Sequence, residues 1–169
     1  MWNIDGAMCF AAEESGAKTV TGVDVMAPTK RFLDEIERRG SKVRFVEGDV
    51  HEAATVATVG PHEVVWCSGV IYHAPHPLLT LERLRELTTG TLLLATETIP
   101  ETPGRRGTCV IAPGPGDHPG ARPPEGPGAG YGPWYWGISP SALRTMLTLS
   151  GFTIAEEFRL PFHVTVVAH

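Results

Sequence analysis

The stretch that decides the fold reads VVWCSGVIYH over residues 64–73, and Pro75 and Pro77-Leu78 follow it. Residues 63–67 form a compact apolar run that ends at Ser68-Gly69, which is typical of a strand entering a turn. Leucines then recur at three-residue steps over residues 78–87, which indicates a helix with one apolar face. This part of the chain is therefore predicted to form a strand–turn–helix unit.

The same alternation of strand and helix extends to both sides of this unit. Further helices are predicted over residues 7–15, 28–39, 52–59 and 139–149, and further strands over residues 18–23, 42–46, 91–98, 152–158 and 163–168. Alternation of this kind favours an α/β fold with a mostly parallel sheet and helices on both faces. The last two strands are joined by a tight turn near Pro161, so they are expected to be antiparallel. We expect a single domain over residues 1–169.

Composition and charge exclude several classes of protein. The chain has 169 residues, 42% of them hydrophobic, and a net charge of -5, which argues against a nucleic-acid-binding surface. No apolar run approaches the roughly 20 residues that span a membrane, and no signal peptide is evident. Three widely spaced cysteines, Cys9, Cys67 and Cys109, form no CxxC pair, so a cytoplasmic location is expected. We interpret Cys67 as a small buried hydrophobe.

Residues 112–137 differ from the rest of the chain. More than half of them are glycine or proline, which excludes a regular helix or a central strand and predicts a long loop. Aromatic residues gather at the end of this loop. We predict that Tyr131, Trp134 and Trp136 bind substrate by stacking on a flat acceptor; packing over the sheet edge is the alternative.

Acidic residues stand where two predicted strands end, which is where α/β sheets bind ligands. Asp24 follows one strand and is placed to accept hydrogen bonds from ribose hydroxyls, although a turn aspartate is an equal alternative. Asp49 follows the next strand and is placed to accept from an adenine amine, while Val50 packs on the ring. Gly6 precedes the first helix and lets the backbone approach a ligand.

Residues 64–78 resemble the fourth-strand segment of class I S-adenosylmethionine-dependent methyltransferases. The likeness is greatest to bacterial domains with a GVLYH segment, which include the wobble-uridine tRNA carboxymethyl-transferase group. Residues 96–101 are similar to the fifth-strand exit of such domains, and residues 134–152 to their late aromatic loop, helix and Gly-Phe strand entry. The resemblance covers nearly the whole chain. It implies a Rossmann-like three-layer sandwich with an antiparallel C-terminal strand, and S-adenosyl-L-methionine as cofactor.

The resemblance also implies a set of site residues. The cofactor-binding residues would be Asp5, Gly6, Asp24, Val25, Asp49, Val50, Ser68, Gly69 and Tyr72. His73 would act as a general base, and Glu97 would orient or deprotonate the acceptor. The alternatives are that Tyr72 and His73 only shape the turn, and that Glu97 caps a helix. Histidines near this turn lack the spacing of a zinc site, so no metal is expected.

One departure from the family concerns the N-terminal end. Family members carry an apolar strand, ending in an acidic residue and a glycine, before the position of Asn3, whereas this chain begins at Met1-Trp2. The first strand is therefore expected to be missing, and we favour a missed upstream start or a fragment over a decayed gene.

The function expected from these features is methyl transfer to a small-molecule acceptor. A tRNA acceptor is less favoured because the chain is acidic and Arg105-Arg106 is the only compact basic pair in the late loop. A decayed methyltransferase-like binding module is one alternative. A nicotinamide-dependent oxidoreductase is the other, and the absence of a GxGxxG fingerprint argues against it.

Overall fold

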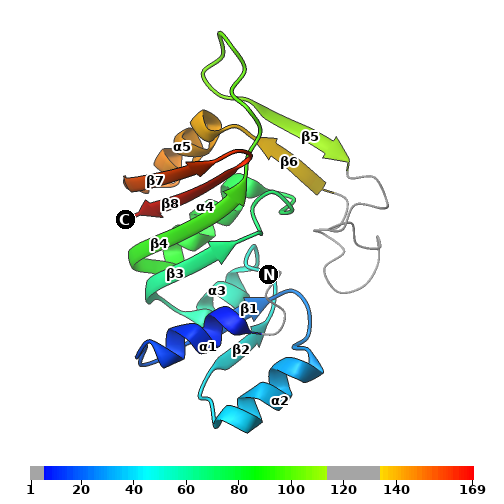
Figure 1. Ribbon diagram of the computed structural model, residues 1–169, viewed down its shortest axis with the longest axis vertical. Helices are drawn as coiled ribbons and strands as arrows, with labels where there is room; N and C mark the ends of the chain where they lie inside the picture. Colours follow the sequence, from blue (N-terminus) through cyan, green and yellow to red (C-terminus); the bar gives the residue numbers. More distant parts are fainter. Residues whose placement is uncertain (1–5, 114–133) are drawn as a thin grey trace. The chain divides into compact units, whose positions relative to one another are not determined.

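The structure is a computed structural model that describes residues 6–113 and 134–169 (Figure 1). The chain divides into two compact units, residues 1–59 and residues 60–169. Each unit has its own hydrophobic core.

The first unit alternates helices with two short strands. Its elements are α1 (Ala7–Glu14), β1 (Thr21–Asp24), α2 (Lys30–Arg39), β2 (Arg44–Glu47) and α3 (Ala53–Val59). The two strands are parallel neighbours, with Asp24 opposite Glu47. Phe10, Phe32 and Val43 form the buried core of this unit.

Local signals define the ends of α2. The Thr29 hydroxyl accepts a hydrogen bond from the Phe32 backbone N–H at 3.1 Å and so caps the first turn. Gly40 ends the helix with φ 59°, a left-handed conformation in which glycine carries no Cβ penalty. The helix predicted over residues 28–39 is confirmed, with its first turn beginning two residues later.

The second unit contains a four-stranded sheet in the order β3-β4-β8-β7. Its strands and helices are β3 (His62–Ser68), α4 (Pro77–Leu87), β4 (Thr88–Glu97), α5 (Pro140–Leu149), β7 (Ile154–Leu160) and β8 (His163–Ala168). β3 and β4 are parallel, and β8 lies antiparallel between β4 and β7. The α/β architecture and the antiparallel C-terminal strand are thus confirmed.

One face of this sheet packs against α4 and α5. Alternate residues of β4 and β8 are buried, with Leu92 and Leu94 at 0% exposed and Val164 and Val166 at 1% exposed. They belong to one core cluster with leucines of both helices, which include Leu81, Leu84, Leu143 and Leu147. Burial of this apolar face fixes the register of the strands, because a slip of one residue would expose the whole set.

A two-stranded ribbon replaces the ends of the predicted loop. β5 (Cys109–Pro113) pairs antiparallel with β6 (Trp134–Ile138), and Ile111 lies opposite Trp136. The loop predicted over residues 112–137 is therefore too long at both ends. The reason is that the last residues of this stretch find their ladder partners among residues 109–113, and Pro113 sits at a strand end, where proline is tolerated.

Among the residues that the structure describes, β1 pairs only with β2, and β3 pairs only with β4. The missing first strand and the single domain stay predictions. Within residues 6–113 and 134–169, no helix has both the length and the apolar composition needed to cross a membrane.

Candidate functional site

Asp24 lies at the carboxyl end of β1 and is only 8% exposed. Its Oδ1 accepts a hydrogen bond from the Met26 backbone N–H at 3.0 Å, which makes an Asx turn directly after the strand. Its backbone carbonyl accepts from the Gly48 N–H at 2.8 Å. These two bonds fix the carboxylate at the strand end and tie it to the loop after β2.

Asp49 lies two residues beyond the end of β2. Its Oδ1 accepts from the His51 backbone N–H at 2.8 Å and lies 3.1 Å from His51 Nδ1. Since β1 and β2 are adjacent and parallel, Asp24 and Asp49 lie at the same edge of this pair. Val25 and Val50 follow the two aspartates directly and are partly buried.

Gly6 has a packing reason for being glycine. It precedes α1 with φ 74°, and a Cβ placed on it would lie 2.2 Å from the Phe32 ring. Its carbonyl accepts from the Phe10 N–H at 3.0 Å, the first bond of the helix. Asp5, the other residue predicted at this position, lies outside the described residues.

In the second unit, the chain leaves β3 through a tight turn. Ser68 ends the strand and is partly buried, and Gly69 has φ 71° while its N–H donates to the Ala95 carbonyl at 3.1 Å. The His73 N–H then donates to the Val70 carbonyl at 2.9 Å. The backbone of this turn is therefore hydrogen-bonded both to β4 and within itself.

Tyr72, His73 and Glu97 come together at the ends of β3 and β4. Tyr72 is 8% exposed, and its ring centroid lies 4.3 Å from that of His73. Burial raises the pKa of the Tyr72 hydroxyl, and the negative charge of Glu97 raises this pKa further. Tyr72 therefore stays protonated at neutral pH, and Glu97 is exposed at the end of β4.

β6 connects the loops that follow these two strands. Trp136 donates from its backbone N–H to the Tyr72 carbonyl at 2.8 Å and from its indole Nε1 to the Ala74 carbonyl at 2.9 Å. The Ile99 N–H, just beyond β4, donates to the Ile138 carbonyl at 3.2 Å. Trp136 is partly buried against the main core of this unit.

The other predicted aromatic residues are Tyr131 and Trp134. Tyr131 lies outside the described residues, and only the backbone of Trp134, in β6, is described. Among the described residues, no group of three or more His, Cys, Asp or Glu side chains could hold a metal ion.

Solved structures share this arrangement. The N-terminal domain of EvdMO1 with SAH bound superposes with a TM-score of 0.70 at 18% identity, covering 98% of this chain and 69% of that chain. A 1,6-didemethyltoxoflavin-N1-methyltransferase from Burkholderia thailandensis, with bound 1,6-didemethyltoxoflavin and S-adenosylhomocysteine, gives a TM-score of 0.67 at 19% identity, covering 97% of this chain and 66% of that chain. The chain has the Rossmann-like fold of methyltransferases. No protein-family model and no curated protein matches it.

A further solved methyltransferase has a similar structure. Magnesium protoporphyrin IX methyltransferase from Synechocystis, with bound SAM, gives a TM-score of 0.62 at 16% identity, covering 97% of this chain and 64% of that chain. Together these likenesses establish the fold, while the roles of individual residues rest on the geometry of the strand ends.

The sequence predicted which residues lie at the strand ends, but it did not predict the hydrogen bonds between β6 and the turn after β3. Asp24, Asp49, Tyr72, His73 and Glu97 all stand at or just after the carboxyl ends of parallel strands, as expected. The double hydrogen bond of Trp136 to the turn after β3 was not foreseen. No local signal could have shown it, because the indole and its acceptor are 62 residues apart in the sequence.

Proposed function

We propose that this chain binds S-adenosyl-L-methionine and transfers its methyl group to a small-molecule acceptor. The observation that carries the proposal is the placement of Asp24 and Asp49 at the ends of adjacent parallel strands, in a fold shared with structures that hold SAM or SAH. Ligands of such sheets lie beyond the carboxyl ends of the strands.

The carboxylates suit the polar groups of this cofactor. Its ribose hydroxyls and adenine amine are hydrogen-bond donors, and ionised carboxylates only accept. We assign the ribose to Asp24 and the amine to Asp49, with Val25 and Val50 packing on the adenine. Gly6 belongs to the same unit as the two aspartates and joins them in the proposed cofactor set. Ser68, Gly69 and Tyr72, the other cofactor residues expected from the sequence, stand at the end of β3 in the second unit and stay predictions.

The demands on the protein during transfer are modest. S-adenosylmethionine, when bound, supplies a methyl group on a positively charged sulfonium sulfur. The chain then has to hold donor and acceptor in line and exclude water. Where the acceptor is a hydroxyl or an amine that loses a proton, His73 Nε2 or Nδ1, or a Glu97 carboxylate oxygen, takes that proton.

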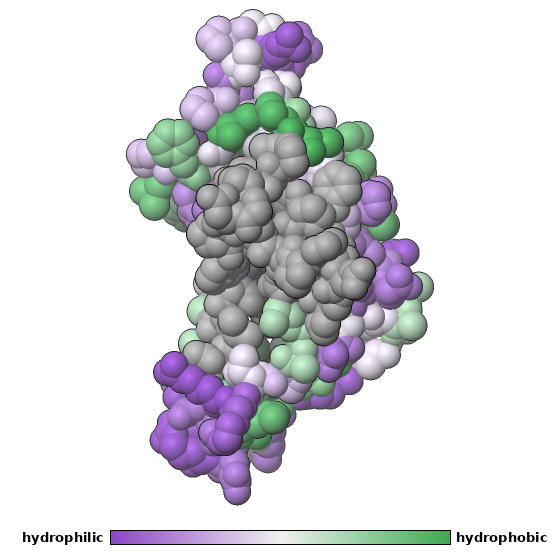
Figure 2. Space-filling model, turned by 90° about the vertical axis from the view of Figure 1, so that its right-hand side faces the viewer, coloured by the Kyte–Doolittle hydropathy of each residue, from purple (hydrophilic) through white to green (hydrophobic). Residues whose placement is uncertain are grey.

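The exposed apolar residues of β5, in the second unit, are consistent with a small and partly apolar acceptor. Val110 and Ile111 of β5 are 48% and 51% exposed, and Figure 2 shows a band of hydrophobic residues in the upper half of the view. The net charge of -5 disfavours tRNA. The substrates named for the toxoflavin and protoporphyrin methyltransferases are also small molecules. The narrower likeness to the GVLYH branch stays a prediction.

Calorimetry with S-adenosylhomocysteine tests the proposal. The full chain should bind this product, and Asp24→Ala should weaken binding by about tenfold to a hundredfold, because hydrogen bonds to a charged group contribute about 1.5–3 kcal/mol. Asp34→Ala is the matched control, since Asp34 is an exposed carboxylate on α2 that pairs with Lys30. This variant should bind like the wild type.

Two outcomes would count against the proposal. A wild-type chain that is folded but does not bind S-adenosylhomocysteine would favour the alternative of a binding module without cofactor. NADH titrated in parallel tests the oxidoreductase alternative, and we expect no heat of binding from it. Equal affinities of Asp24→Ala and wild type would remove Asp24 from the ribose site.

A further inference from the structure

Trp136 stands between the core of the second unit and the turn that carries Tyr72 and His73. The sequence predicts that it stacks on an acceptor, yet its indole N–H already donates to the Ala74 carbonyl at 2.9 Å. Its ring is partly buried and packs against the main core cluster. The indole donor and part of the ring are therefore already engaged within the fold.

The two bonds of Trp136 bracket His73. Its backbone N–H binds the carbonyl of the preceding residue, Tyr72, and its indole binds the carbonyl of the following residue, Ala74. Inside the turn, the Val70 carbonyl accepts from His73 at 2.9 Å and the Ile71 carbonyl accepts from Ala74 at 3.4 Å. The carbonyls of Val70, Ile71, Tyr72 and Ala74 therefore all accept hydrogen bonds, two of them from a single residue of β6.

The residues on either side of the Tyr72–His73 pair are more buried than His73 itself. Ile71 and Ala74 are fully buried at 0% exposed, whereas His73 is only partly buried and lies against the Tyr72 ring. The turn thus has two fully buried residues, Ile71 and Ala74, on either side of the Tyr72–His73 pair. His73 lies between the two residues whose carbonyls accept hydrogen bonds from Trp136.

We propose that Trp136 is a positioning residue, which sets the Tyr72–His73 pair at the end of β3 through these two hydrogen bonds. The proposal rests on the proposed function and deepens it, because that pair borders the suggested site of transfer. It gives Trp136 a role in addition to the stacking expected from the sequence, which stays a prediction. The position of the pair itself is a property of the folded chain, so it is measurable without any ligand.

The test compares Trp136→Phe with Trp66→Phe. Phenylalanine keeps an aromatic ring and the backbone N–H of residue 136 but removes the indole donor. Trp66 is a suitable control because it is 51% exposed on β3. In Trp136→Phe we expect the His73 backbone amide to exchange with solvent about three- to tenfold faster, the effect of losing one hydrogen bond of about 1 kcal/mol. We also expect weaker nuclear Overhauser contacts between the Tyr72 and His73 rings.

A merely structural role would give a different result. If Trp136 only filled space, the Leu94 and His73 amides would speed up together through global unfolding, or neither would change, and the ring contacts would be preserved; either result overturns the proposal. Equal changes in Trp66→Phe would overturn it as well. Binding of S-adenosylhomocysteine is measured separately, so a wild type that does not bind refutes the proposed function while the exchange result still decides the role of Trp136.

Discussion

At the scale of single residues, two constraints favour glycine at position 6: a left-handed backbone and a lack of space for a Cβ. Comparison with Gly16 separates the two. Its φ of 74° strains any residue with a Cβ, and that Cβ would also strike the Phe32 ring at 2.2 Å. Gly16 has φ 92°, but a Cβ added there would meet nothing within 4 Å. Gly16→Ala should therefore cost about 1 kcal/mol of unfolding free energy for backbone strain, and Gly6→Ala about 2–4 kcal/mol because overpacking adds to it. Urea unfolding monitored by circular dichroism measures both, and equal losses would contradict the steric argument.

The three cysteines offer a second test at this scale. Burial raises the pKa of the Cys67 thiol to about 12, and Cys67 is 5% exposed, whereas Cys109 is exposed on β5. Because the thiolate is the reactive form, Cys67 should resist iodoacetamide at pH 8 while Cys109 is labelled. Mass spectrometry after short labelling measures this, and addition of urea should make Cys67 reactive. Labelling of Cys67 in the folded chain at the Cys109 rate would show that it is not buried.

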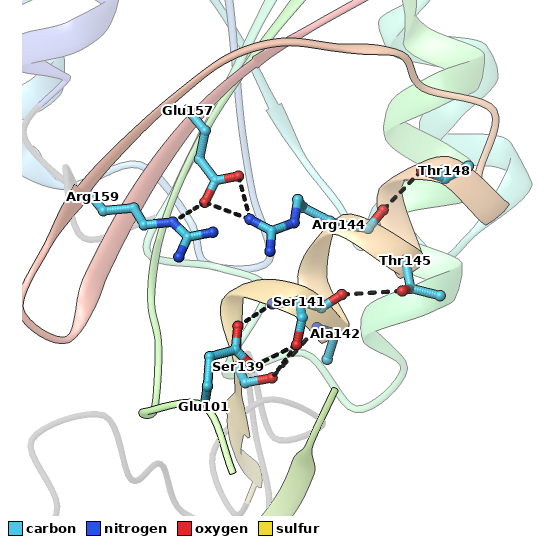
Figure 3. A network of polar contacts seen from close by, with 9 residues as sticks. All are labelled: Glu101, Ser139, Ser141, Ala142, Arg144, Thr145, Thr148, Glu157 and Arg159. Carbon is cyan, nitrogen blue, oxygen red and sulfur yellow. Dashed lines mark hydrogen bonds and ion pairs between the residues drawn. The ribbon is translucent and has the colours of Figure 1, made fainter. Parts of the chain in front are cut away.

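At the scale of elements, α5 is held at its first turn by a polar network (Figure 3). The Ser139 hydroxyl accepts from the Thr108 N–H at 3.0 Å and from the Ala142 N–H at 3.4 Å, and Ser139 is 0% exposed. Ser139→Ala should cost about 1–2 kcal/mol, since it removes the helix cap and leaves a buried N–H without an acceptor. Thr148→Ala, near the exposed end of the same helix, is the control and should change stability little. Thermal unfolding of both variants measures the difference, and equal losses would contradict the capping argument.

Glu101 adds a pH dependence to the same network. It accepts hydrogen bonds from the Ser141 hydroxyl and from the Ser141 backbone N–H at 2.8 Å, and the hydroxyl bond is the main cause that lowers the pKa of this carboxyl below its ordinary value. A lowered pKa in the folded state stabilises the fold above the unfolded pKa, and this stability is lost as the pH falls through the folded pKa. Glu101→Gln should therefore be less stable than wild type at pH 7 in urea unfolding, and the difference should shrink as the carboxyl becomes protonated in acid. Glu37→Gln, at an exposed carboxylate on α2, is the matched control for the loss of one carboxylate.

Some of the helices and strands could be predicted from the sequence, and others could not. α2 was predicted from its apolar face and from Gly40 after it, and α5 from Ser139 as its cap and Gly151 after it. All of these signals act within a few residues. The strand ends with Asp24 and Asp49 followed from the strand–helix alternation. The β5–β6 ribbon was missed because its pairing joins residues on either side of a glycine- and proline-rich stretch. The two hydrogen bonds of Trp136 were missed for a similar reason, because the Tyr72 and Ala74 carbonyls come close to Trp136 only after the chain has folded.

At the scale of the whole molecule, the two units differ in the size of their cores. Among the described residues, the core cluster of residues 60–169 contains fourteen buried residues, which include Leu92, Leu94, Val164 and Val166. The corresponding cluster of residues 1–59 contains three, Phe10, Phe32 and Val43. Because buried apolar surface is the main source of stability, the first unit should open more readily than the second. Native-state hydrogen exchange should show faster exchange for β1 and β2 amides than for β4 and β8 amides.

Because the first unit is expected to open more readily, binding of the cofactor to it should be measurable by native-state hydrogen exchange. Asp24 and Asp49 both belong to the less stable unit, so a ligand that binds them must be released before that unit opens. At a hundredfold excess over its dissociation constant, S-adenosylhomocysteine should stabilise the closed unit by about 2.7 kcal/mol, which slows exchange in β1 and β2 by about a hundredfold. In Asp24→Ala the same ligand concentration should give much smaller protection, while β4 amides exchange as in wild type. Protection of β1 and β2 that is equal in both proteins would show that the ligand binds without Asp24.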